Sequence, residues 1–193
     1  YSEMTSSCSG DGDYAHVCSV TGLAQGTNTI HIACGDILLN EDSAASNDDI
    51  TYYLDSQAPA LSSFSPAGGE RIGQIDPVVT FTSDETAECR WSINDVKYGD
   101  MPAGNGCAVD GMDHTCYVEG LSEGMDYVHF ACEDEAGNRN SASTNYDIGY
   151  TVDLSPPTVS DIDPADGSTV SVTSISIDFN TGEDAMCRWS LSD

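Results

Sequence analysis

Positive charge is scarce in this sequence. Five Lys and Arg residues, of which Lys97 is the one lysine, stand against 33 Asp and Glu, which gives a net charge of −28. Nucleic-acid binding needs a cationic surface, so the composition argues against a nucleic-acid partner and against an anionic membrane surface. No run of about 18 apolar residues occurs, so we expect no membrane span. The chain begins at Tyr1 without an initiator Met or a signal-peptide pattern, which indicates a mature or excised piece.

Motifs for catalysis are also lacking. The sequence has no Gly-rich phosphate loop, no nucleophile elbow and no His-Glu zinc pattern. Thirty-three acidic residues produce carboxylate pairs by chance, so a pair of Asp residues carries no catalytic weight. We expect a protein that is not an enzyme, and we assign no catalytic residue.

Cysteine is the one chemically reactive residue present in quantity. The eight Cys are separated by 10, 16, 55, 18, 9, 16 and 55 residues, and no paired C-x-x-C spacing suits zinc. Disulfides are therefore favoured over metal ligation, and they indicate an oxidising compartment. We expect an extracellular or cell-surface protein.

The cysteine spacings repeat because the whole sequence repeats. The segment AECRWS at 87–92 returns as AMCRWS at 185–190, and 187 − 89 = 98. Cys18 and Cys34 match Cys116 and Cys132 at the same offset. The sequence therefore contains a unit of about 98 residues.

Unit boundaries do not coincide with the chain ends. Residues 58–154 make one complete unit, 1–57 correspond to the later part of a unit, and 155–193 correspond to the earlier part of the next one. Reading Asp193 into Tyr1 restores the intact pattern, short by two residues. We interpret the two end segments as complementary parts that are completed by a neighbouring copy.

Each unit has the pattern of an antiparallel β-sandwich. Short alternating runs recur with Pro and Gly turns between them, and helical periodicity is absent. The pattern predicts strands at 60–65, 77–83, 88–93, 116–118, 127–134 and 145–152. The predicted fold class is all-β, with tandem sandwiches stapled by disulfides.

A family resemblance supports this prediction. Leu121 followed by Tyr127 resembles the turn and tyrosine that lead into strand F of fibronectin type III domains. The CRWS segment followed by Cys132-Glu-Asp-Glu-Ala-Gly-Asn138 resembles the tandem immunoglobulin-like repeats of microbial extracellular surface proteins and filaments. The first unit keeps Asp36 in this motif but lacks the Gly-Asn turn, so we expect a loop of different shape there.

The resemblance also implies the cysteine pairing. In such a sandwich, Cys89 at the start of strand C faces Cys132 at the end of strand F. Cys107 then pairs with Cys116, and Cys8 pairs with Cys18. Homology gives Cys34 and Cys187 the same bridge as Cys89 and Cys132, formed between neighbouring copies.

Three further side-chain types have structural interpretations. His31 and His129 fall on the outer face of their strand, which predicts exposed surface residues. Trp91 and Trp189 are expected in the core. For Arg90 we favour an ion pair with a nearby carboxylate.

The acidic residues suggest calcium sites where units join, since calcium prefers carboxylate oxygens. Strand G and the linker bring the chain to the loops of the next unit. At the first junction this gathers Asp55, Asp84, Glu85 and Asp134. At the second it gathers Asp153, Glu183 and Asp184, with Asp36 from the neighbouring copy.

The leading functional hypothesis is a structural repeat of an extracellular filament, sheath or stalk, whose partners are copies of itself joined head to tail. The repeats form either one tandem-repeat polypeptide or separate subunits that exchange strands. A spacer or adhesive repeat of a large, calcium-stiffened surface adhesin is the alternative. A third interpretation is an accessory domain of a secreted polysaccharide enzyme.

Overall fold

The computed structural model describes residues 4, 6–10 and 14–192. Its regular structure is nearly all β, as predicted, with two short 3-10 turns. Tyr1 and Asp193, which would form the join between copies, lie outside the described residues. Within the described part, no helix is long and apolar enough to cross a membrane.

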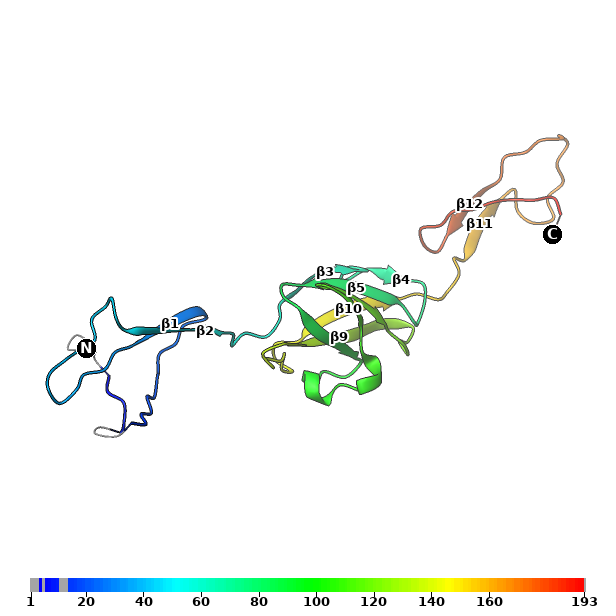
Figure 1. The fold of residues 1–193 in the computed structure, drawn as a ribbon. Helices are drawn as coiled ribbons and strands as arrows, with labels where there is room; N and C mark the ends of the chain where they lie inside the picture. Colours follow the sequence, from blue (N-terminus) through cyan, green and yellow to red (C-terminus); the bar gives the residue numbers. More distant parts are fainter. Residues whose placement is uncertain (1–3, 5, 11–13, 193) are drawn as a thin grey trace.

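Residues 58–154 fold into a β-sandwich that occupies the middle of the chain (Figure 1). One sheet has the strand order β4-β10-β9-β6 and the other has the order β3-β5-β8-β7. The strands are β3 (Leu61–Ser65), β4 (Arg71–Ile72), β5 (Val78–Ser83), β6 (Ala87–Ser92), β7 (Ala108–Asp110), β8 (Asp113–Tyr117), β9 (Gly124–Asp134) and β10 (Tyr146–Val152). All neighbouring strands are antiparallel except β4 and β10.

The core of the sandwich comes from alternating side chains of both sheets. In β5, Val79 and Phe81 are buried while Thr80 between them is exposed, as a half-buried strand requires. Phe130 of β9 packs edge-on against Phe81, with ring centroids 5.3 Å apart. Trp91 is only 7% exposed and joins this core, as expected from the sequence.

The segment between β6 and β7 covers part of the outer face of the sheet. It contains η1 (Tyr98–Asp100) and η2 (Ala103–Asn105), and its Tyr98 and Met101 pack on Ala131 of β9. The guanidinium of Arg90 lies over the Tyr98 ring, 4.5 Å from its centroid. Among the described residues no ion pair of Arg90 is found, so the expected ion pair is replaced by a cation–π contact.

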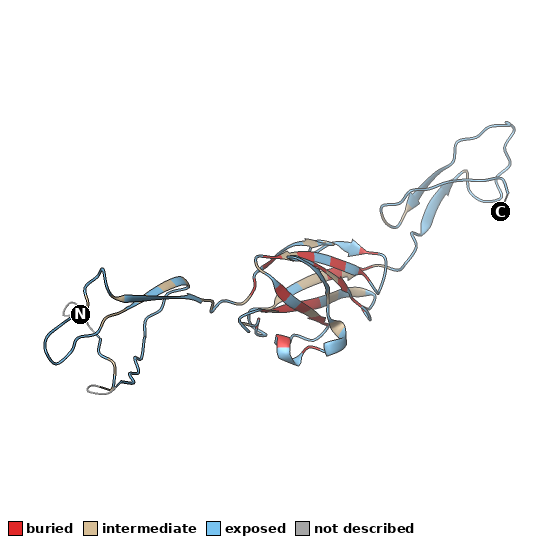
Figure 2. Cartoon of the chain, in the orientation of Figure 1, coloured by how far each residue is buried: buried red, intermediate tan, exposed pale blue. Residues whose placement is uncertain are grey.

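Two shorter pieces flank the sandwich, and we call them the N-terminal half-unit (residues 4–57) and the C-terminal half-unit (155–192). The first contains the hairpin β1 (Gly26–Ile32) and β2 (Asp48–Leu54), and the second pairs β11 (Val159–Asp163) with β12 (Asp178–Thr181). Figure 2 shows that buried residues concentrate in the sandwich, whereas both half-units are almost entirely exposed.

Candidate functional site

Each half-unit reproduces one hairpin of the central sandwich, residue for residue. The β1–β2 pair runs from Gly26 opposite Leu54, and the β9–β10 pair runs from Gly124 opposite Val152, which is the same register shifted by 98 residues. In β11–β12 the partners 159/181, 160/180 and 163/178 are those of β3–β5 plus 98, including the irregularity between the second and third. The 98-residue repeat of the sequence is therefore a repeat of structure.

Side chains buried in the sandwich are exposed at the equivalent positions of the half-units. Trp91 is 7% exposed and Trp189 is 84% exposed, although they occupy the same position of the repeat. Phe81 is 2% exposed, and its repeat equivalent Phe179 is 41% exposed. Tyr150 is fully buried, whereas its repeat equivalent Tyr52 is 54% exposed. The half-units therefore present core-type apolar faces that nothing in the described chain covers.

The cysteines divide in the same way. The structure has the three expected bonds, Cys8–Cys18, Cys89–Cys132 and Cys107–Cys116. Disulfides persist in oxidising environments. Cys34 and Cys187 are free and exposed, and they are the repeat equivalents of Cys132 and Cys89. Each half-unit thus carries one free cysteine at a position that is disulfide-bonded in the sandwich.

Three carboxylates meet where the N-terminal half-unit joins the sandwich. Asp55 precedes the linker, Glu85 lies between β5 and β6, and Asp134 ends β9; one oxygen of each lies within 4.8 Å of the others. Burial raises the pKa of Glu85 to about 7, helped by the negative charges of Asp55, Asp134 and Asp84. A hydrogen bond from the Gln25 side chain, 2.8 Å long, lowers the pKa of Asp55.

The fourth residue expected at this junction has another role. One carboxylate oxygen of Asp84 accepts the backbone N–H of Ala60 at 2.7 Å and thereby holds the linker. The structure therefore brings together three of the four predicted calcium ligands.

The second junction differs from the first in its charge. Asp153 accepts a hydrogen bond from the Arg71 guanidinium at 3.0 Å, so a cation already faces it. Glu183 and Asp184 line the same pocket as this pair. Arg71 was not anticipated at this site, because its partner lies 82 residues away in sequence and the two meet through the parallel pairing of β4 with β10.

Asp36 shows that the expectation of a differently shaped loop in the first unit was wrong. Its carboxylate accepts the backbone N–H of Asn40 at 2.8 Å, and Asp134 accepts that of Asn138 at the same distance. The side-chain amides of Asn40 and Asn138 also donate to the carboxylates of Asp36 and Asp134, at 2.6 Å and 2.8 Å respectively. Asn40 therefore retains the turn, and Leu39 adopts the positive φ of 66° that Gly137 adopts at 87°.

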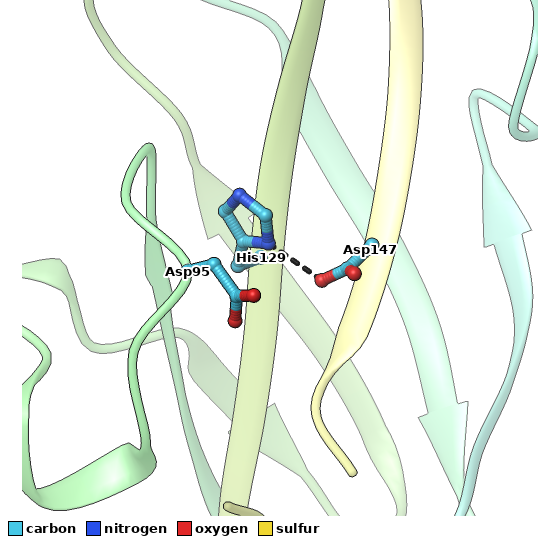
Figure 3. A group of neighbouring side chains, drawn as sticks. All are labelled: Asp95, His129 and Asp147. Carbon is cyan, nitrogen blue, oxygen red and sulfur yellow. Dashed lines mark hydrogen bonds and ion pairs between the residues drawn. The ribbon is translucent and has the colours of Figure 1, made fainter. Parts of the chain in front are cut away.

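A second cluster lies on the outer face of the sheet, at residues whose spacing in the sequence indicates no metal site. His129 of β9 meets Asp147 of β10, with Nδ1 and Oδ1 2.5 Å apart, and Asp95 approaches from the loop after β6 (Figure 3). The His129 side chain is 11% exposed, so the outer-face prediction holds but the expected exposure does not. The loop that carries Asp95 lies against this histidine.

Comparisons with known proteins assign no family to this chain. The chain matches no protein-family model and no curated protein. Among solved structures, it resembles CopC from Methylosinus trichosporium OB3b at 14% identity and a TM-score of 0.35, over 49% of this chain and 93% of that chain. A likeness at this level carries no functional argument.

Proposed function

We propose that this chain is a structural repeat of an extracellular filament, sheath or stalk, in which successive repeats join head to tail by completing a split immunoglobulin-like sandwich. One observation carries the proposal: two hairpins of the central sandwich recur in the half-units in identical register, with their core-type faces exposed. The proposed function needs no catalysis.

The complement of each half-unit comes from another repeat. The two half-units lie on opposite sides of the sandwich (Figure 1), which separates them within one chain. In the sandwich, the equivalents of these halves meet through β6–β9 and β5–β8 pairing. Burying each large apolar side chain at such a seam contributes about 1.5–3 kcal/mol. The contact is head to tail and does not close on itself, so it generates a fibre.

A covalent bond reinforces the proposed seam. In the sandwich, Cys89 and Cys132 face each other across β6 and β9. Pairing the half-units in that register sets Cys187 opposite Cys34 of the adjoining repeat. The same seam forms whether the repeats belong to one polypeptide or to separate chains.

Isotope mixing tests the seam directly. The 193-residue chain is produced with ¹⁴N and with ¹⁵N, and the two are mixed while reduced, oxidised together and digested without reduction. We expect Cys34–Cys187 peptides in which one partner is light and the other heavy, and non-reducing gels with multiples of 20.4 kDa. The matched variant C187S should abolish both. Exclusively unmixed light or heavy peptides would mean that the ends of one chain join, which contradicts the proposal.

Electron microscopy and mass then distinguish the two forms of the array. We expect filaments with an axial step of about 70–80 Å, given the usual rise and length of strands. The reduced native protein has the mass of one repeat if the subunits are separate, and a much larger mass if the repeats are continuous.

The carboxylates of Asp55, Glu85 and Asp134 favour a second candidate, a spacer of a large surface adhesin stiffened by calcium. Without a cation, burial and the charges of Asp55 and Asp134 disfavour ionisation of Glu85, and calcium accepts such ligands. We expect calcium to raise the melting temperature of the chain and the variant E85Q to lose most of that increase. The exposed E119Q serves as control. Equal calcium responses in E85Q and E119Q would rule out this site.

A further inference from the structure

We infer that His129, Asp147 and Asp95 form a binding site for a divalent transition-metal ion, such as Zn²⁺, on the outer face of the β6–β9–β10 sheet. A ring nitrogen of His129 and one carboxylate oxygen from each Asp lie within 4.8 Å of one another. The inference is independent of the head-to-tail assembly and of the calcium junction.

The ligand set determines the class of ion. Imidazole nitrogen suits zinc, copper and nickel, whereas calcium and magnesium take oxygen ligands alone. A zinc ion about 2.0–2.2 Å from each ligand holds the ligand atoms about 3–4 Å apart. His129 Nδ1 and Asp147 Oδ1 are 2.5 Å apart, so this pair has to open slightly to admit the ion, and the exposed Asp95 supplies the third ligand.

The surroundings hold this loop in reach of the ion. The Asn145 side-chain amide donates to Asp95 Oδ1 at 2.9 Å and to the Val96 carbonyl at 3.2 Å. Asn145 lies next to β10, the strand that carries Asp147, so one element anchors two of the three ligands.

Charge also favours a cation. The cations of the sandwich have other partners: Arg71 with Asp153, Lys97 with Asp100 and Arg139 with Glu133, while Arg90 lies over the Tyr98 ring. Within the described residues, the two carboxylates of the site face no Lys or Arg, and His129 is their one basic neighbour. With a neutral imidazole the site carries two negative charges, which a dication neutralises.

The repeat supplies an independent second instance of the pair. His31 Nδ1 contacts Asp49 in the N-terminal half-unit, and both residues sit 98 positions before His129 and Asp147. There the His31 side chain is 55% exposed, because no loop equivalent to that of Asp95 covers it within the described residues. The sequence equivalent of Asp95 is Asp193, which lies outside those residues.

Zinc binding to the full oxidised chain, measured by isothermal titration calorimetry in excess Ca²⁺, tests the inference. We expect a site that D95N weakens by about tenfold or more, since even outer-shell losses cost 10–100-fold. D95N is the decisive variant because it leaves the His129–Asp147 pair intact. If this pair only stabilises the fold, D95N should leave zinc binding unchanged. H129Q should have a similar effect. Cobalt(II) bound at the site should give visible d–d absorption that both variants lose.

Two matched controls separate this site from general acidity. D100N removes an exposed carboxylate from the same loop, and H16Q removes an exposed histidine of the N-terminal half-unit. Both should bind zinc as the parent chain does. Equal binding by the parent, D95N and H129Q would overturn the inference, as would an equal loss in all four variants. Trp emission before titration verifies that each variant is folded.

Discussion

Cys89 and Cys132 stand directly opposite each other in the antiparallel register of β6 and β9, and a disulfide joins them across the sheet. This bond closes a loop of 43 residues, whereas Cys107–Cys116 closes one of 9. The chain-entropy model gives about 4 kcal/mol for the longer loop and about 2.6 kcal/mol for the shorter one. We expect C89A/C132A to lower the free energy of unfolding more than C107A/C116A in urea titrations. The reverse order would show that native-state strain outweighs loop entropy.

Trp189 should report assembly of the half-units. In the variant W91F it is the only tryptophan, and it is 84% exposed. If the seam buries Trp189 as the sandwich buries Trp91, its emission should shift to the blue as protein concentration rises. W189F, which retains the buried Trp91, should show no such shift. Emission from W91F that does not depend on concentration, in a chain not already multimeric, would count against the seam.

Glu85 makes the stability of the junction depend on pH. Its pKa is about 7 in the folded chain, against an ordinary value of 4.5, mainly because of burial. Between these values the folded state keeps a proton that the unfolded state has lost. The free energy of unfolding in calcium-free buffer should therefore fall as pH rises from about 4.5 to about 7. Urea titrations should show a smaller decrease for E85Q than for the control E119Q. An equal decrease in the free energy of unfolding with pH in both variants would mean that a group other than Glu85 titrates.

The turn after β9 needs a positive φ, which Gly137 adopts without strain. A side chain there meets no atom within 4 Å, so the cost of G137A is purely conformational. We expect it to destabilise the sandwich by about 1–2 kcal/mol. G104A, at a position with open space and no positive φ, is the control. Thermal unfolding of the two variants measures the difference, and similar melting temperatures would contradict the explanation.

Strand positions could be predicted from the sequence because they follow from local alternation and the 98-residue repeat, whereas the disulfide partners followed from the resemblance to immunoglobulin-like repeats. The predicted runs at 77–83 and 127–134 lie within one to three residues of β5 and β9. The shape of the Asp36 turn could not be predicted from its missing glycine, because Asn40 keeps the hydrogen bonds to Asp36 and Leu39 adopts the positive φ.

Contacts between distant segments were not predictable in this way. The His129 cluster depends on the path of the loop after β6, which has no periodic signal. The Arg71–Asp153 pair depends on the two-residue strand β4, which is too short to show alternation. At the first junction, topology alone indicated three of the clustered carboxylates, since strand ends and linker converge there. It could not show that Asp84 bonds to the linker backbone instead.

The Cys89–Cys132 bond also limits how far the central sandwich can lengthen under tension. Of the 97 residues from 58 to 154, the 42 residues between these two cysteines cannot extend while the bond is closed. When the chain is pulled from its ends, only about half of the residues of the unit can therefore extend. Reduction would add a further length of about 150 Å, at roughly 3.5 Å per residue. A fibre of such units would resist overstretching in oxidising surroundings and become far more extensible once its disulfides are reduced.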